Sequence, residues 1–353
     1  MNRRHELQRK MIPEAMDLLE RRFTILRTIS LEEPLGRRTL ARRTALTERV
    51  VRAETDFLKS RNFIDILPRG MIMTTEGREI LMAFQEILKD FLGLEEMAQV
   101  IEEKYHFKKV IVVPGNCDES HEPLEEIGRK ACAMLVRLLK SNQVVALTGG
   151  NSIKMMVEQV PAGEQFPAVT VVPARGGVGR HYDIQSNTLV GRLADKIGGA
   201  YRLLNLPDNL SEASFQAMLH EQEVRDTIAL IKKTDVVVAG VGDAMNMAKR
   251  RGLSQEETGQ LVQTGARGEF FGSYYNDRGE IVKQNLTVGL SLEDVEKARE
   301  VIVLAGGASK GRAIASVRFK TLNAVLITDE GAAREMIEMS KGMEIEQTTK
   351  AKS

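Results

Sequence analysis

Seven short runs rich in valine and isoleucine, separated by helix-length amphipathic segments, constrain the fold of residues 108–340 more than any other feature. The runs are KKVIVVPG, QVVALTGG, AVTVVPARGG, AYRLLNLP, DVVVAGVGDA, EVIVLAGG and NAVLITDEG. Most contain β-branched apolar residues without polar alternation, which is typical of strands buried on both faces. The alternation of such strands with helices predicts an α/β fold with a doubly wound, Rossmann-like parallel sheet and right-handed crossovers.

Glycine-containing turns directly follow four of these strands. They are TGGNS at 148–152, RGG at 175–177, GVGD at 240–243 and GGASK at 306–310. In an open α/β sheet, ligands bind outside the carboxyl ends of the strands, where backbone amides and helix N-termini approach an anion. Arg175, Arg250 and Lys310 would add positive charge there. The pattern predicts a site for a small, multiply anionic ligand, although a single glycine pair is also what an ordinary tight turn uses.

Two of these cations have alternative interpretations. Lys310 could be a solvated residue at the start of a helix, but the helix dipole disfavours a cation there, which favours a functional role. Arg250 and Arg251 could form a helix C-terminus that ends at Gly252. The spacing within 306–310 matches neither the P-loop nor the dinucleotide-binding glycine pattern, so the type of phosphate is left open.

An enzyme is the main alternative, because sugar-phosphate isomerases and deaminases also use phosphate-handling α/β domains. Such enzymes need a positioned general base, for which His181, Asp243 and Glu269 are the candidates. Glu269 lies in a glycine- and aromatic-rich insertion at 265–280, which is expected to fold over the site. No Ser-His-Asp or metal-ligand cluster is evident, and the five histidines are scattered. We therefore expect no catalytic residue, no metal and no cofactor.

The first 80 residues predict a helix-turn-helix. The apolar positions at helical spacing are Leu19, Phe23, Leu26 and Ile29 in 16–30, Leu40 and Ala41 in 37–44, and Val50, Val51, Phe57 and Leu58 after a cap at Thr47. Two strand-like runs, 63–67 and 71–74, flank a Pro-Arg-Gly tip and predict the hairpin wing of a winged helix. Another helix would start at Thr74 or Thr75. The spacing over 80–105 predicts one long helix, which either joins protomers or docks on its own body.

Charge is distributed unevenly along the chain. Residues 1–80 contain 17 Lys and Arg against 12 Asp and Glu, whereas the rest contains 33 against 37, which suggests a polyanion partner for the first part. On the presumed reading helix, Glu48, Arg49, Arg52 and Thr55 lie off the apolar stripe, where they would face a major groove. The predicted DNA-binding residues are Arg37, Arg38, Thr47, Glu48, Arg49, Arg52 and Arg69. The alternative is an ordinary solvated helix face.

Ordered motifs along roughly 320 residues carry a resemblance to a known family. They are LGRRTLARRTALTERVVRAETDFLKSRNFIDI, ALTGGNSI, VVPARGGVG, AMNMAKRRG, GEFFGSYYNDRGE, GGASKGRAI and VLITDEGAA. The chain resembles the sugar-binding transcriptional regulators of the SorC/DeoR-type family. The resemblance implies a repressor of glycolytic genes, with fructose 1,6-bisphosphate as effector and with a body that looks like a sugar-phosphate isomerase domain without catalysis.

The same resemblance implies roles for individual effector-binding residues. A phosphate loop would comprise Gly149, Gly150, Asn151 and Ser152, phosphate or sugar contacts would come from Arg175, Gln185, Arg250 and Lys310, and Glu269 would accept from a hydroxyl. Two threonines stand in the family where this chain has Asn151 and Ser152. An amide and a hydroxyl can still donate hydrogen bonds, but the preferred sugar is left open.

These inferences predict four regions: a winged helix-turn-helix at 1–80, a helical linker at 81–107, a phosphosugar-binding and oligomerisation domain at 108–340, and a flexible tail at 341–353. No stretch is long and apolar enough for a membrane span, the N-terminus lacks a secretory signal pattern, and the two cysteines suit a reducing compartment. We expect a cytoplasmic repressor without a membrane partner. It would bind double-stranded operator DNA as a homodimer or homotetramer, with a phosphorylated sugar altering its affinity for DNA.

Overall fold

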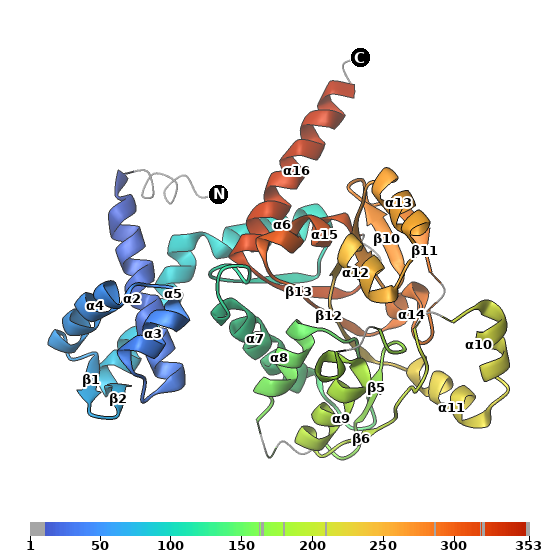
Figure 1. The fold of residues 1–353 in the computed structure, drawn as a ribbon, viewed down its shortest axis with the longest axis horizontal. Coiled ribbons are helices and arrows are strands. Elements are labelled where there is room, and N and C mark those ends of the chain that lie inside the picture. Colours follow the sequence, from blue (N-terminus) through green and yellow to red (C-terminus); the bar gives the residue numbers. More distant parts are fainter. Residues whose placement is uncertain are drawn as a thin grey trace. The chain divides into compact units, whose positions relative to one another are not determined.

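The computed structural model describes residues 11–350, except 162, 164–165, 179–180, 209, 286, 318 and 320–321. The chain divides into two compact units, Met1–Met97 and Ala98–Ser353, and Figure 1 labels most of their helices and some of their strands. The described residues include no helix that is both long and apolar enough to cross a membrane.

Unit 1 begins with three helices, α2 (Pro13–Glu32), α3 (Arg37–Thr44) and α4 (Glu48–Ser60). Ala45 ends α3 in the left-handed conformation, and the Thr47 hydroxyl caps α4 by accepting from the Val50 amide, as its sequence predicted. The residues that form the core between these helices are Phe23, Leu26, Ile29, Leu40, Val51 and Leu58. The three helical segments predicted from apolar spacing are therefore confirmed.

A β-hairpin follows α4, formed by β1 (Ile64–Leu67) and β2 (Gly70–Met73) in antiparallel register. The Glu33 carboxylate accepts from the Met73 amide at 2.6 Å and fastens the hairpin to the end of α2. The order of helices and hairpin is the order predicted for a winged helix. The helix expected over 80–105 is instead two helices, α5 (Thr75–Leu92) and α6 (Leu94–Tyr105), because Gly93 adopts a left-handed conformation with φ of 64°.

Unit 2 contains a seven-stranded parallel sheet, and its strands are the seven that the sequence predicted. In spatial order they are β3 (Lys109–Val113), β13 (Ala324–Asp329), β12 (Glu300–Leu304), β7 (Val236–Ala239), β4 (Val144–Leu147), β5 (Thr170–Pro173) and β6 (Ala200–Tyr201). From β4 the chain winds outward through β5 and β6, and from β7 it winds the other way through β12 and β13. The switch point between β4 and β7 is where a doubly wound sheet opens a crevice for a ligand.

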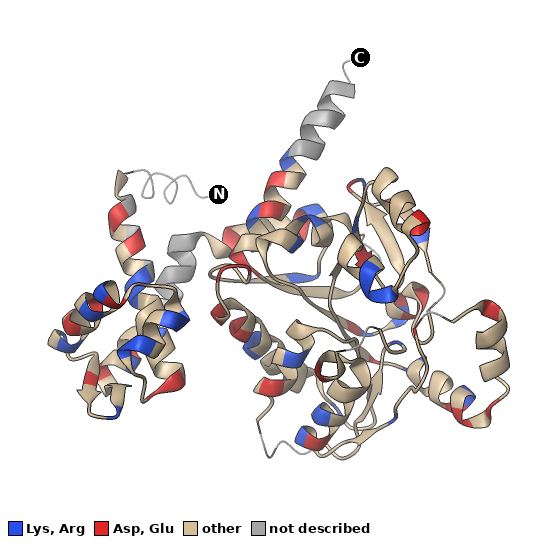
Figure 2. Ribbon diagram, in the orientation of Figure 1, with Lys and Arg blue, Asp and Glu red and all other residues tan. Residues whose placement is uncertain are grey.

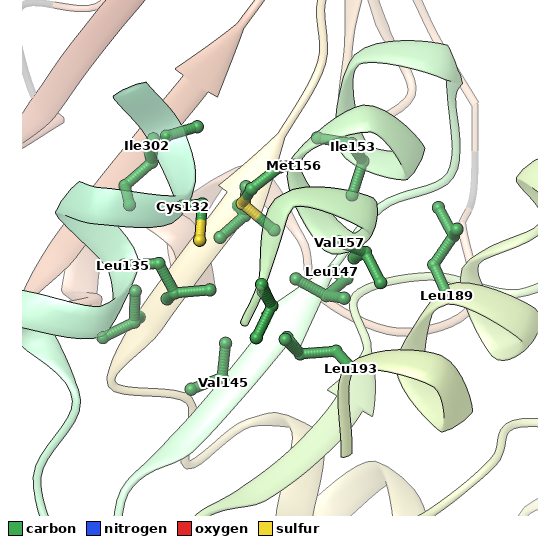
Figure 3. Packing of buried hydrophobic residues seen from close by; sticks show 14 of the residues in the cluster. Cys132, Leu135, Val145, Leu147, Ile153, Met156, Val157, Leu189, Leu193 and Ile302 are labelled. Atoms are coloured by element: carbon green, nitrogen blue, oxygen red, sulfur yellow. The ribbon is translucent and has the colours of Figure 1, made fainter. Parts of the chain in front are cut away.

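The helices that connect the strands of this sheet or follow its last strand are α7 (Glu122–Leu138), α8 (Asn151–Gln159), the short η1 (Tyr182–Ile184), α9 (Ser186–Ile197), α10 (Glu212–Met218), α11 (Gln222–Ile231), α14 (Leu292–Lys297), α15 (Ala308–Ser316) and α16 (Glu330–Lys350). Figure 3 shows Leu135 of α7, Met156 of α8 and Leu193 of α9 packing towards strand β4. The helix α16 extends into the range 341–353, for which a flexible tail was expected, and the last three residues lie outside the described part.

A second, antiparallel sheet was not predicted. Its strands β8 (Gly242–Asp243), β9 (Ala266–Phe270), β10 (Ser273–Asn276) and β11 (Ile281–Gln284) lie in the order β11-β10-β9-β8. The helices α12 (Ala244–Arg251) and α13 (Gln255–Gln263) connect β8 to β9. The glycine- and aromatic-rich insertion at 265–280 thus forms sheet strands, and Glu269 lies on β9.

Candidate functional site

A cavity of about 1220 Å³ opens at the switch point of the parallel sheet. The nine residues predicted to bind an effector all line it, namely Gly149, Gly150, Asn151, Ser152, Arg175, Gln185, Arg250, Glu269 and Lys310. These residues come from the turns after β4 and β5, the first turns of α8 and α15, the junction of η1 and α9, helix α12 and strand β9. The fold therefore brings together residues that are up to 161 positions apart in the sequence, from Gly149 to Lys310.

The N-terminus of α8 offers open backbone donors to this cavity. Gly150 precedes the helix with φ of 130° and provides no side-chain cap, and its own amide donates to the Ile184 carbonyl. Within the described part of the chain, no acceptor contacts the amides of Asn151, Ser152 or Ile153. Three such N–H groups together with the positive end of a helix dipole are suited chemically to an anionic group such as a phosphate.

The N-terminus of α15, by contrast, is filled by side chains of the protein itself. The amides of Gly307, Ala308 and Ser309 donate to Asp329, Asn116 and Asp118 at 2.7, 3.1 and 2.7 Å. The prediction that backbone amides of the turn at 306–310 approach an anionic ligand is therefore wrong. Side-chain oxygens of Asn116 and Asp118 in the loop after β3 and of Asp329 at the end of β13 accept from these amides, and only Ser309 and Lys310 of the turn line the cavity.

Three cations without a carboxylate partner among the described residues line the cavity: Lys249, Arg250 and Lys310. Burial lowers the pKa of the Lys310 amine, and the charge of Arg250 lowers it further, while Cys117, Asp118 and Asp329 act in the opposite direction. An anionic ligand would relieve the repulsion between Lys310 and Arg250. Lys249 was not predicted to line the site, although it belongs to the basic run Lys249-Arg250-Arg251 from which Arg250 was chosen.

A second group of charges is buried and internally balanced. Arg175 donates from Nε and Nη2 to the two oxygens of Asp208 at 3.0 and 2.5 Å, and from Nη1 to Glu269 at 3.1 Å. Arg251 donates to Glu269 at 2.9 Å and lies 3.2 Å from Asp208. Burial opposes ionisation of Glu269, but the charges of the two arginines outweigh it and hold the pKa of this carboxyl below its usual value. Sequence reasoning missed Asp208 and Arg251 in this role.

Both readings of the Arg250–Arg251 pair apply in the structure. Gly252 ends α12 in the left-handed conformation, as expected for a helix C-terminus. Arg251 points inwards to the buried charges, whereas Arg250 is exposed at the cavity. Gln185 also lines the cavity, but its side-chain amide closes the preceding loop by bonding to both the N–H and the carbonyl of Val178.

The candidate DNA interface lies on unit 1. Thr47, Glu48, Arg49 and Arg52 are exposed along the first half of α4, and Arg69 is exposed at the hairpin tip. Figure 2 shows basic residues on both α3 and α4. Thr55, expected on the same exposed face, is completely buried and donates to the Arg52 carbonyl, so its assignment to that face was wrong. The position is one helical turn beyond Val51, which places it on the core side.

Two of the predicted DNA-binding arginines have acidic partners within unit 1. Arg37 donates to Asp56 at 2.6 Å, and Arg38 lies 3.8 Å from Glu48. For Arg49 and Arg52 no ionic partner is found in the described part of the chain. The guanidinium groups of these two residues are therefore the ones free to reach a base edge or a phosphate.

The two units match two protein families. Residues 18–88 match the "CggR N-terminal DNA binding domain", and residues 89–338 match the "Putative sugar-binding domain". A DNA-binding domain in one chain with a sugar-binding α/β domain defines a transcriptional regulator that responds to a sugar. The chain belongs to the SorC-type family of sugar-binding transcriptional regulators.

Among its relatives are two named central glycolytic genes regulators. The protein from Priestia megaterium is 39% identical over 94% of this chain and 97% of its own length, and that from Bacillus subtilis is 36% identical over 96% and 99%. A SorC family regulator from Enterococcus faecalis has a solved structure with a TM-score of 0.63 and 31% identity, covering 69% of this chain and 99% of its own. The full-length sorbitol operon regulator of Klebsiella pneumoniae shares the fold with a TM-score of 0.61 over 92% of this chain, at 17% identity.

Proposed function

We propose that this regulator represses central glycolytic genes and that fructose 1,6-bisphosphate sets its affinity for operator DNA. The similarity to two proteins named central glycolytic genes regulators supports the assignment of glycolytic genes as targets. The single observation that supports the ligand is the pairing, in one cavity, of the open amides of α8 with the unpartnered cations Lys249, Arg250 and Lys310. Amides at a helix N-terminus suit one phosphate, and a cluster of cations suits the other.

The effector acts by binding two states of the protein with different affinity, since a ligand that binds both equally shifts neither. We expect the ligand-bound state to have the weaker affinity for DNA, so that repression falls when glycolytic flux is high. The protein acts as a homodimer or homotetramer, because helix-turn-helix readers bind paired half-sites. The effector would then change how the DNA-binding units of the assembly cooperate.

Asn151 and Ser152 belong to this site as the first two residues of α8. Both backbone amides are available whatever the side chain, so the phosphate position itself does not need threonine. The side chains differ in reach and donor number, and we expect them to modulate affinity between phosphorylated sugars rather than to abolish binding.

The alternative is an isomerase or deaminase that acts on the same kind of ligand. Its general base would need a pKa near the working pH. Glu269 has a lowered pKa and two arginine partners, and Asp243 accepts from the Asn246 amide as the cap of α12, so both carboxylates suit hydrogen-bond acceptance better than proton abstraction. Steady turnover of a phosphosugar that is lost in Glu269→Gln would favour the enzyme.

The test measures two binding events separately. Operator fragments from upstream of glycolytic genes are titrated with the protein in gel-shift assays, with and without fructose 1,6-bisphosphate, and calorimetry measures the sugar directly. We expect specific operator binding that weakens when the sugar is present. If fructose 1,6-bisphosphate binds but does not change the affinity for the operator, the proposed regulation by this sugar is refuted. If it does not bind and another phosphosugar binds strongly, the identity of the proposed ligand is refuted.

A further inference from the structure

Four buried charged side chains tie together segments that lie far apart in the sequence. Arg175 follows β5, Asp208 follows β6, Arg251 ends α12 and Glu269 lies on β9, and each side chain is less than one-tenth exposed. Two positive and two negative charges neutralise one another inside the protein. Asp208 does not line the cavity, so this residue can influence a ligand only through its two arginine partners.

The two carboxylate oxygens of Glu269 have different surroundings. Oε1 accepts from Arg175 at 3.1 Å, from Arg251 at 2.9 Å and from the Gly272 amide at 2.6 Å. Oε2 has no donor among the described groups and lies on the side of Gly242, where a Cβ atom would come within 3.4 Å of it. Gly242 and Glu269 both line the cavity. The three donors therefore orient the carboxylate so that one ionised oxygen is left for a ligand.

Asp208 in turn orients both arginines. Its Oδ1 accepts from Arg175 Nε at 3.0 Å, and its Oδ2 lies 2.5 Å from Arg175 Nη2 and 3.2 Å from Arg251 Nη2. Its backbone amide donates to the Gly177 carbonyl at 3.1 Å, which keeps the segment beside the turn after β5. A planar guanidinium held by two carboxylates has little freedom to rotate.

We infer that Asp208 and Arg251 are positioning residues that make the site selective for a hydroxyl-bearing bisphosphate, by holding Glu269 with Oε2 turned to the cavity. This inference rests on the proposed function and identifies what the site requires of the sugar between its phosphates. A hydroxyl that donates to Oε2 satisfies a buried anion, whereas a bisphosphate without hydroxyls leaves that anion desolvated and unpaired.

The test compares two probes by calorimetry, fructose 1,6-bisphosphate and hexane-1,6-diol bisphosphate, which carries two phosphates and no hydroxyl. The wild-type protein should prefer the sugar by roughly 10- to 100-fold, as expected for a hydrogen bond to a charged group. In Asp208→Asn and Arg251→Met this preference should fall to about threefold or less. Because Asp208 does not line the cavity whereas Arg251 does, the affinity for the diol bisphosphate should change little in Asp208→Asn. Arg251→Lys, which keeps the charge, should restore part of the preference.

Arg267→Met is the matched control, because Arg267 lies on the same strand β9, is exposed and pairs with Asp277 away from the cavity. It should keep the wild-type preference. Calorimetric melts show whether each variant is folded. If a single variant does not fold, the double variant Arg251→Met/Glu269→Gln is used instead, because it removes one charge of each sign. It should likewise lack the preference.

The inference would be overturned if folded variants of Asp208 and Arg251 kept the full preference for the sugar, or if their affinity for both probes fell to the same extent. Either result would leave the proposed function in place. A wild-type protein that binds neither probe would overturn the proposed function, and the inference with it.

Discussion

Lys310 places a half-buried ammonium group at the cavity from the first turn of α15. Burial and the neighbouring Arg250 both lower the pKa of this amine, which means that they disfavour its charged form. A bound phosphate would stabilise the charged form and raise the pKa again. The sequence singled out this residue because a lysine beside a glycine pair at a strand end is a local pattern. The burial and the neighbouring Arg250 that distinguish it from an ordinary surface lysine come from other parts of the chain.

Replacing this side chain tests its role directly. We expect Lys310→Ala to weaken binding of fructose 1,6-bisphosphate by roughly 10- to 100-fold, because a charge-assisted hydrogen bond contributes about 1.5–3 kcal/mol. Isothermal titration calorimetry measures the change. Arg312→Ala is the control, since Arg312 is exposed on the same helix and does not line the cavity. Equal affinity of Lys310→Ala and wild type would exclude Lys310 from the site.

Asp118 shows why a glycine-rich turn is an ambiguous signal. Its carboxylate accepts from the Ser309 amide at 2.7 Å and from the Ser309 hydroxyl at 2.9 Å, and so occupies the place that an anion would take at α15. The loop that carries Asp118 precedes Ser309 by 191 positions, and no local pattern links the two. A free helix N-terminus and an internally capped one therefore look the same in sequence.

We expect Asp118→Ala to lower the free energy of unfolding by about 1–2 kcal/mol, since a helix loses its capping carboxylate. The vacated amide and hydroxyl of Ser309 should then bind inorganic phosphate, so that phosphate raises the melting temperature of the variant more than that of wild type. Differential scanning calorimetry with and without phosphate checks this. Asp226→Ala, at an exposed position on α11, should behave as wild type does. An equal response to phosphate in Asp118→Ala and wild type would contradict the prediction.

At the scale of elements, α4 is the helix expected to read DNA. Its buried side includes Val51, Thr55 and Leu58, and buried Glu54 accepts from Arg22 of α2 at 2.8 Å. This packing leaves Arg49 and Arg52 exposed in the first half of the helix. In helix-turn-helix proteins the first turns of the second helix contact base edges, whereas later turns face away.

We expect Arg49→Ala and Arg52→Ala each to weaken operator binding by about 1–3 kcal/mol, while fructose 1,6-bisphosphate binds as before. Lys59→Ala, at the far end of α4, is the control and should have a smaller effect. Salt titrations separate the roles, because loss of a phosphate contact reduces the slope of log affinity against log salt by about one. Variants that keep wild-type operator affinity would place the reading surface elsewhere.

Elements differed in how well sequence predicted them. The seven strands of the parallel sheet were predicted because burial on both faces requires continuous apolar runs. Strands β9 to β11 were missed, since ARGEF, SYYN and IVKQ are short and mixed in polarity, and glycines lie within the first and between the strands. Only pairing with one another makes these segments strands, and pairing depends on contacts outside each segment.

For the whole molecule, two compact units predict two responses to ligand. We expect calorimetric unfolding to show a transition from Ala98–Ser353 that rises in temperature with fructose 1,6-bisphosphate, by about 2.7 kcal/mol of stabilisation at 100 times Kd. Operator DNA should instead stabilise Met1–Met97. Isolated fragments of each unit identify the transitions. A sugar-dependent rise of the first unit alone would contradict the placement of the effector site.

Local sequence was enough to establish a helix-turn-helix with a hairpin, a parallel sheet and the edge of that sheet at which glycines and cations gather. These features follow from periodicity and turn residues within single elements, where neighbours in sequence are neighbours in space. The folded chain was needed to show that α8 is open while α15 is capped, and that Arg251 is buried among carboxylates while Arg250 is exposed at the cavity. Those distinctions depend on partners from other parts of the chain: Asp118 caps α15 from 191 positions away, and Asp208 and Glu269 hold Arg251 in the interior, where an unpaired charge would be too costly.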